Sequence, residues 1–210
     1  RKESSAASDV YKRQELMLRD ARSLDLSALA VVCGCGGGTA VRELLPRVLS
    51  TARALVLDAD ALNAIASDDG LRTQLKARTK RGRPTVLTPH PLEAARLLGG
   101  TAGEVQADRL AAARRLAAQT GAVVVLKGSG TIVADDAGTV PVLNPTGNAR
   151  LASAGTGDVL AGMVGAGLAA GHEAFEAAWQ AAWHHGDLAD RWPADAPPLT
   201  AGALARQSPR

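Results

Sequence analysis

The chain has 210 residues, of which 46% are hydrophobic, and its formal net charge at pH 7 is +3. This length suits one sizeable domain with a continuous core. Lysines and arginines are scattered among the acids rather than gathered into a basic stripe, which argues against a nucleic-acid partner, and no apolar run is long enough to span a bilayer. We therefore expect a cytoplasmic protein with no membrane partner.

The first fourteen residues differ from the rest of the chain. The segment RKESSAASDVYKRQ is polar and has no periodicity, and it carries neither the apolar core nor the cleavage site of a signal peptide. It also resembles a run that occurs at the ends of translated environmental sequence fragments. We expect residues 1–14 to be non-native or disordered and residues 15–210 to form the domain.

The two cysteines, Cys33 and Cys35, are one residue apart. This spacing is too close for an ordinary disulfide and provides only half of the ligands of a structural zinc site. We expect both to be small apolar side chains in a reducing cytoplasm.

From residue 29 onward, short apolar runs alternate with helical patterns. Buried strands are predicted at residues 29–33, 54–58, 85–89 and 122–127. Between and after them, helical spacing of apolar residues occurs at 40–52, 61–67, 91–99 and 105–121, and the last two segments end at glycine. A hairpin is predicted over 131–144, followed by helices at about 157–170, 173–190 and 200–206. The order predicts an α/β fold: a mostly parallel sheet with helices on both faces and an antiparallel hairpin at its edge.

Ligands of such sheets bind beyond the carboxyl ends of the strands, and the first two predicted strands end in unusual residues. The first runs into Gly34 and Gly36–Gly38, which form either a backbone concavity for an anion or a plain tight turn. The second ends at Asp58 and Asp60. One of these two acids is expected to cap the next helix while the other faces the cleft.

The third strand runs into a stiff turn, Thr88-Pro89-His90-Pro91. Pro91 is predicted at the first helical position and Glu93 in the first turn. His90 and Glu93 have two readings: they stabilise the helix start, or they are held in the rigid loop to contact a substrate or a hydrated magnesium ion.

The fourth strand ends at Lys127, which precedes Gly128, Ser129 and Gly130. A lysine and several backbone N–H groups in this arrangement can surround a phosphate. A simple glycine turn before the hairpin is the alternative.

The segment GTGD, residues 155–158, leads directly into an apolar helix. The first turn of a helix has unpaired N–H groups and a partial positive charge, so it holds an anion without any side chain. Asp158 in that turn is either a helix cap or a general base that takes a proton from a substrate hydroxyl beside a bound phosphoryl group. Three glycines within the same helix predict close approach of another backbone: Gly162, Gly165 and Gly167.

Taken together, the segments DADALN, TPHPLEAARLLG, LKGSGT and NPTGNARLASAGTGDVLAGM resemble the ADP-dependent NAD(P)H-hydrate dehydratases of the ribokinase-like superfamily. The resemblance extends from about Glu15 to the C-terminus. It implies a ribokinase-like fold and a cytoplasmic enzyme that repairs (S)-NAD(P)H-hydrate, with ADP as co-substrate, Mg²⁺ as cofactor, and AMP and phosphate as products. A homo-oligomer, usually a tetramer, is also implied.

The resemblance also assigns residues to roles. Asp158 is implied to be the catalytic base and a substrate contact. The implied substrate side comprises Gly38, His90, Pro91, Leu92, Glu93, Ala94, Ala95 and Arg96. The implied ADP site comprises Lys127, Gly128, Ser129, Gly130, Thr131, Asn148, Ala149, Arg150, Leu151, Ala152, Ser153, Ala154, Gly155, Thr156 and Gly157.

The chain departs from the family's pattern before Glu15, where members carry a further N-terminal portion. Its absence predicts an exposed sheet edge and exposed apolar helix faces. A second departure is Cys35, which stands where the family usually has proline. Two other interpretations remain: an ATP-dependent ribokinase-like kinase of a small vitamin-precursor alcohol, and a catalytically silent nucleotide-binding fragment.

Overall fold

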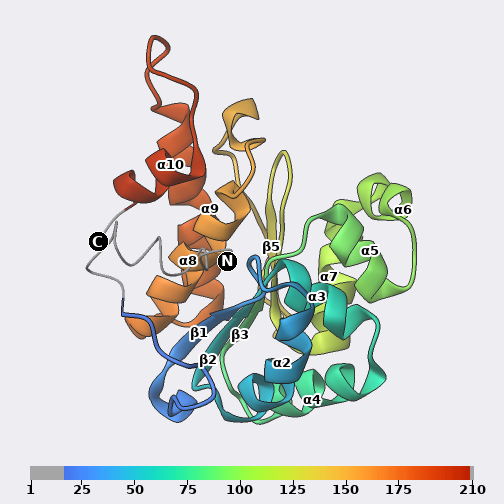
Figure 1. Cartoon of the computed structure of the whole chain (residues 1–210). Helices are drawn as coiled ribbons and strands as arrows, with labels where there is room; N and C mark the ends of the chain where they lie inside the picture. The colour runs from blue at the N-terminus through green and yellow to red at the C-terminus, as the bar shows by residue number, and fades with distance from the viewer. Residues whose placement is uncertain (1–16, 209–210) are drawn as a thin grey trace.

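The computed structural model describes residues 17–208 (Figure 1). The predictions made for residues 1–14 lie outside this range. Within it, no helix is long and apolar enough to cross a membrane.

A six-stranded sheet forms the centre of the molecule, with its strands in chain order. Strands β1, β2, β3 and β4 run parallel to one another, whereas β5 runs antiparallel to both β4 and β6. The prediction of a mostly parallel sheet with an antiparallel hairpin at its edge is confirmed. The strands are β1 (Ala30–Cys33), β2 (Ala54–Leu57), β3 (Thr85–Leu87), β4 (Val123–Leu126), β5 (Ile132–Ala134) and β6 (Val142–Leu143).

Helices cover both faces of the sheet (Figure 1). Successive side chains of a strand point to opposite faces of the sheet, so each strand contributes to two hydrophobic cores. In β2, Leu55 and Leu57 belong to one core, and Ala54 and Val56 belong to the other. The first core is closed by α2 (Val41–Thr51), α3 (Ala59–Ala66), α4 (Asp69–Lys80), α5 (Pro91–Leu98), α6 (Ala102–Ala107) and α7 (Arg109–Thr120). The opposite face carries α8 (Thr156–Ala169) and α9 (Ala174–Asp190), against which α10 (Ala201–Gln207) packs.

The helices differ from the prediction in two places. The segment 105–121 is not one helix: α6 ends at Ala107 and α7 begins at Arg109, because the carboxylate of Asp108 accepts a hydrogen bond from the Ala111 amide at 2.9 Å and starts a new helix. Helix α4 was not predicted, since it buries only Leu71, Leu75 and Arg78.

The glycines of α8 correct another prediction. A Cβ at Gly165 would lie 2.4 Å from a methyl group of Val32 in β1, and one at Gly167 would lie 3.0 Å from the Cβ of Ala177 in α9. Nothing lies within 4 Å of such an atom at Gly162. The predicted close approach therefore holds at two of the three positions, and the neighbours are mainly side chains rather than backbone.

Strand β1 forms an outer edge of the described sheet. Val32 on this strand is 38% exposed, and Leu29 just before it is 39% exposed. This edge therefore carries partly exposed apolar side chains.

Candidate active site

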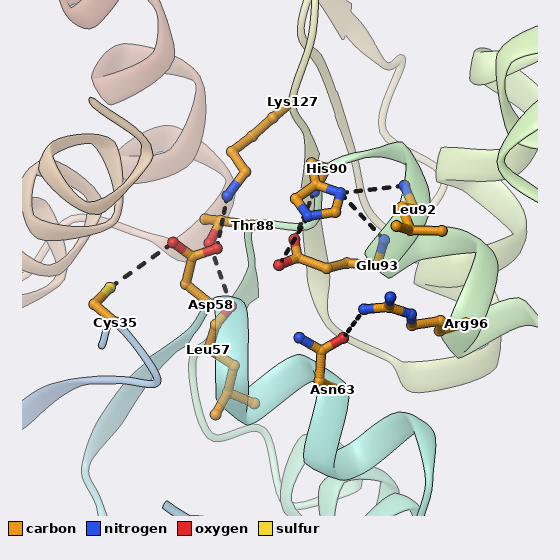
Figure 2. A network of polar contacts seen from close by, with 10 residues as sticks. All are labelled: Cys35, Leu57, Asp58, Asn63, Thr88, His90, Leu92, Glu93, Arg96 and Lys127. Atoms are coloured by element: carbon orange, nitrogen blue, oxygen red, sulfur yellow. Dashed lines mark hydrogen bonds and ion pairs between the residues drawn. The ribbon is translucent and has the colours of Figure 1, made fainter. Parts of the chain in front are cut away.

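The candidate site lies where the carboxyl ends of the parallel strands meet (Figure 2). Asp58 follows β2 and Lys127 follows β4, and the lysine Nζ lies 2.7 Å from the Asp58 Oδ1. The Asp58 side chain is 1% exposed. A carboxylate this deeply buried requires a partner, so the ion pair fixes the lysine at the mouth of the sheet.

Neither acid after β2 caps helix α3, which corrects the capping prediction. Asp58 occupies the N-cap position but makes no capping hydrogen bond, because its carboxylate binds Lys127. Asp60 instead accepts a hydrogen bond from the Gly38 amide at 2.7 Å. The other half of the prediction stays a prediction: the buried Asp58 carboxylate bonds Lys127, which lines the pocket described below, but neither acid is among the residues that line it.

Cys35 is the residue whose surroundings differ most from the expectation of an apolar filler. Its Sγ lies 3.8 Å from the Asp58 Oδ2, and donor atoms of Cys35, Asp58 and Asp158 all lie within 4.8 Å of one another. Burial, followed by repulsion from the two carboxylates, raises the pKa of the Cys35 thiol to about 12. Cys33, by contrast, packs against the core as predicted.

From this environment we expect the thiol of Cys35 to be poorly reactive. In a Cys33→Ser background, we expect iodoacetamide at about pH 8 to alkylate Cys35 at least about 100-fold more slowly in the folded than in the urea-unfolded protein, because only the thiolate reacts. The rate is expected to rise as the pH increases toward the raised pKa. Asp158→Asn should accelerate alkylation by removing one repelling charge. Mass spectrometry of timed samples measures these rates, and folded and unfolded rates within tenfold of each other would contradict the expectation.

The side chains of His90 and Glu93 form a capping box at the turn after β3. The Nδ1 of His90 accepts hydrogen bonds from the Leu92 and Glu93 amides at 3.2 and 3.3 Å, while a Glu93 carboxylate oxygen accepts from the His90 amide at 2.8 Å. Pro91 starts the helix as predicted. The helix-stabilising reading is therefore realised for both His90 and Glu93.

The remaining substrate-side predictions fall into two groups. Ala94 and Ala95 are each 1% exposed and belong to the first core, so their side chains serve packing. Leu92 is exposed, and Arg96 reaches across to α3, where its Nη1 donates to the Asn63 Oδ1 at 2.6 Å (Figure 2). The ring of His90 is also partly exposed, which leaves an accessible surface of His90, Leu92 and Arg96.

A pocket of about 440 Å³ lies beside the ion pair. It brings together eleven of the residues assigned to ADP: Lys127, Gly128, Ser129, Gly130, Thr131, Asn148, Ala149, Leu151, Ala152, Thr156 and Gly157. Four others assigned to ADP are not in its lining: Arg150, Ser153, Ala154 and Gly155. The sequence did not identify seven further lining residues: Asn144, Thr146, Gly147, Leu160, Ala182, His185 and Gly186.

Two of these missed residues shape the pocket wall. A Cβ at Gly186 would lie 2.2 Å from the Oγ1 of Thr146, so the missing side chain lets the loop after β6 lie directly on α9. The Thr146 hydroxyl donates to the Trp183 carbonyl at 2.8 Å and closes this contact. The segment HHG, residues 184–186, was the available signal, because a glycine inside a helix indicates close approach of another part of the chain.

The first turn of α8 completes the site. Its N-cap residue is Gly155, at φ +83°, and no side chain caps the helix. Asp158 is exposed in that turn and is not the N-cap, so the capping reading is not realised. The carbonyl of Thr156 is bonded to the Nε2 of buried His185 at 2.8 Å, and burial lowers the pKa of this histidine. The Thr156 amide donates to the Ser153 carbonyl at 3.3 Å, so the N–H groups that this turn offers to an anion are those of Gly157 and Asp158, beside the Asp158 carboxylate.

Sequence comparisons place these features in a family. The family model described as NAD(P)H-hydrate dehydratase matches residues 4–210. An ADP-dependent (S)-NAD(P)H-hydrate dehydratase of Neisseria meningitidis serogroup B is 48% identical over 182 residues, which cover 84% of this chain and 60% of that protein. A bifunctional NAD(P)H-hydrate repair enzyme of Moorella thermoacetica is 46% identical over 171 residues, which cover 73% of this chain and 30% of that enzyme. The chain therefore spans less than two thirds of these relatives.

Solved structures agree with this result. An ADP/ATP-dependent NAD(P)H-hydrate dehydratase from Bacillus subtilis, co-crystallized with ATP/Mg²⁺ and soaked with CoA, is 32% identical and superimposes with a TM-score of 0.75 over 96% of this chain and 74% of that one. A ribokinase-like superfamily protein from Enterococcus faecalis, 24% identical with a TM-score of 0.64 over 80% of this chain and 56% of that one, supports the fold alone. The fold is ribokinase-like, and the chain belongs to the NAD(P)H-hydrate dehydratase family.

Proposed function

We propose that this protein converts (S)-NAD(P)H-hydrate back to NAD(P)H at the expense of ADP, with release of AMP and phosphate. One observation carries the proposal: the exposed carboxylate of Asp158 stands in the first turn of α8, next to open N–H groups and the Lys127–Asp58 ion pair. The names of the relatives from Neisseria and Bacillus support the same reaction. The 440 Å³ pocket beside the first turn of α8 also supports the proposal, because it is large enough for part of a nucleotide.

In the proposed reaction, Asp158 takes the proton of the ring hydroxyl, and the hydroxyl oxygen attacks the β-phosphorus of ADP. The bond from that phosphorus to the bridging oxygen breaks, and AMP leaves. The N–H groups of the α8 first turn and the ammonium of Lys127 stabilise the charge on the transferred phosphoryl group. The phosphorylated ring then loses phosphate and a proton from the adjacent carbon, which restores the double bond.

The ADP assignment covers residues 127–131 and 148–157, eleven of which line the pocket, with the phosphates directed at the first turn of α8. We assign Mg²⁺ to the same end of the pocket. Asp58 and Asp158 bring carboxylate oxygens within 4.8 Å of each other and of the Cys35 thiol. Because Asp58 is already paired with Lys127, the ion would be held mainly by the nucleotide's phosphates and by water, as is usual for Mg²⁺. Bound there, the ion would supply charge neutralisation for the phosphates.

The proposed substrate surface is the accessible part of residues 90–96 together with Gly38. We also propose that the protein acts in the cytoplasm as a homo-oligomer, with a tetramer as the expected form. The apolar edge at Leu29 and Val32 supports self-association. Size-exclusion chromatography with light scattering measures the mass in solution, and a monomer at working concentration would contradict this part of the proposal.

The activity test supplies the chain with hydrated NADH or NADPH, ADP and Mg²⁺. Recovery of the reduced-nicotinamide absorbance, with one AMP formed per hydrate consumed, is the expected result, and omission of ADP should abolish it. Turnover of ATP with a vitamin-precursor alcohol and none with the hydrate would favour the kinase interpretation. ADP binding measured by calorimetry without turnover of either substrate would favour a silent nucleotide-binding fragment.

A further inference from the structure

Arg109 makes an unusual set of contacts at the loop that follows β4. Its Nη1 donates to the carbonyls of Ser129 and Gly130, the latter at 3.0 Å. Its Nη2 donates to the carbonyls of Leu126 and Lys127 at 3.1 and 3.3 Å. One side chain therefore gathers four backbone carbonyls from five consecutive residues.

The carbonyls determine where the amides of this loop point. In a planar trans peptide, the N–H of each residue is directed opposite to the carbonyl before it. Carbonyls turned toward Arg109 consequently turn the N–H groups of Gly128 and Gly130 away from it. Neither of these amides, nor that of Ser129, makes a hydrogen bond within residues 17–208, and all three residues line the 440 Å³ pocket.

The charge of Arg109 adds to this arrangement. No carboxylate forms a salt bridge with its guanidinium in the described part of the chain. The acid just before it, Asp108, is used to cap α7. The Nε of Arg109 is buried and has no hydrogen-bond partner in the described part of the chain. The positive charge is therefore bound only by neutral carbonyls, and it remains available to attract an anion on the opposite side of the loop.

Gly128 shows that loop and arginine fit closely. A Cβ at this position would lie 2.9 Å from the Arg109 Nη2, and the backbone has φ +145°, which favours glycine. The loop conformation and the arginine position therefore depend on each other.

From these contacts we infer that Arg109 is a positioning residue for nucleotide binding: it holds the loop 127–131 so that its amides receive the phosphates of a nucleoside diphosphate. This inference rests on the proposed ADP site. Nothing in the sequence pattern pointed to this arginine, which stands at the start of a helix 18 residues before Lys127. It does not touch the nucleotide in this arrangement and acts through the loop.

The test compares Arg109→Met and Arg109→Lys with Arg114→Met, a matched control that removes the same charge from an exposed position of α7. Calorimetry measures the affinity of each protein for ADP and for adenosine. We expect Arg109→Met to weaken ADP binding by about 30-fold and adenosine binding by less than about threefold, since charge-assisted contacts to phosphate carry the difference. Arg109→Lys should fall between Arg109→Met and wild type, and the control should match wild type.

Circular dichroism establishes that each variant is folded. If Arg109→Met does not fold, Arg109→Lys decides, because lysine keeps the charge but lacks the planar fork that reaches four carbonyls. Wild-type ADP affinity in a folded Arg109 variant, or an equal loss of ADP and adenosine affinity, would overturn the inference. Failure of the wild-type chain to bind ADP is a different result, and it would overturn the proposed function.

Discussion

The Asp158→Asn protein is expected to turn over the hydrate about 1,000-fold more slowly than wild type, while its affinity for ADP changes by less than about threefold. Asparagine occupies nearly the same volume but cannot accept the proton of the ring hydroxyl. The side chain is exposed and caps nothing, so the first turn of α8 keeps its conformation. Coupled measurement of NAD(P)H recovery and ADP calorimetry separates the two effects.

Asp69→Asn is the matched control for this experiment, because Asp69 also lies exposed in the first turn of a helix, far along the chain in α4. It should leave both turnover and ADP affinity unchanged. An Asp158→Asn protein that loses ADP affinity and thermal stability together would show that the carboxylate supports the helix. Retention of more than a tenth of the wild-type turnover would assign the base to another group.

Arg78→Met is expected to lower the free energy of unfolding by about 3–5 kcal/mol, because several buried acceptors lose their donor and each costs about 1–3 kcal/mol. Arg78 is 1% exposed. Its guanidinium donates to four backbone carbonyls and to the hydroxyl of Thr85. Burial lowers its pKa to about 10, so the charge is retained at neutral pH. The carbonyls come from the end of α2 and the approaches to β2 and β3: Leu49, Ala52, Arg53 and Pro84.

Urea denaturation followed by circular dichroism measures this loss. Arg81→Met, an exposed position directly after α4, provides the control and should change stability by less than about 0.5 kcal/mol. Arg78→Lys is expected to recover only part of the loss, since an ammonium cannot reach all five acceptors. A loss below about 1 kcal/mol in Arg78→Met would indicate that water replaces the guanidinium.

The sequence predicted the features that depend on local pattern. Apolar runs located the four parallel strands, and glycines marked the ends of α5 and α7, where Gly99 and Gly121 adopt left-handed conformations. Asp158 was placed correctly in the first turn of a helix because the GTGD segment precedes apolar residues at helical spacing. Each of these signals lies within a few residues of the feature it describes.

The arginines show why the rest was not predictable. Arg78 and Arg109 sit in helices whose sequences give no sign of a special role, and their partners are backbone carbonyls 6 to 29 residues away. Carbonyls are the same at every position, so no residue type reveals such a pairing. The carboxylate neighbours of Cys35 escaped notice for a related reason, because they come together only through the folding of β1, β2 and α8 against one another.

Gly186 has a consequence for the width of the nucleotide pocket. The loop after β6 and helix α9 form adjoining walls, and they meet where this glycine has no side chain. Even one methyl group there would meet both the hydroxyl and the backbone of Thr146, and the loop would have to move off the helix and change the pocket's shape. The absence of a side chain at Gly186 therefore helps to set the dimensions of the pocket, although glycine has no reactive group.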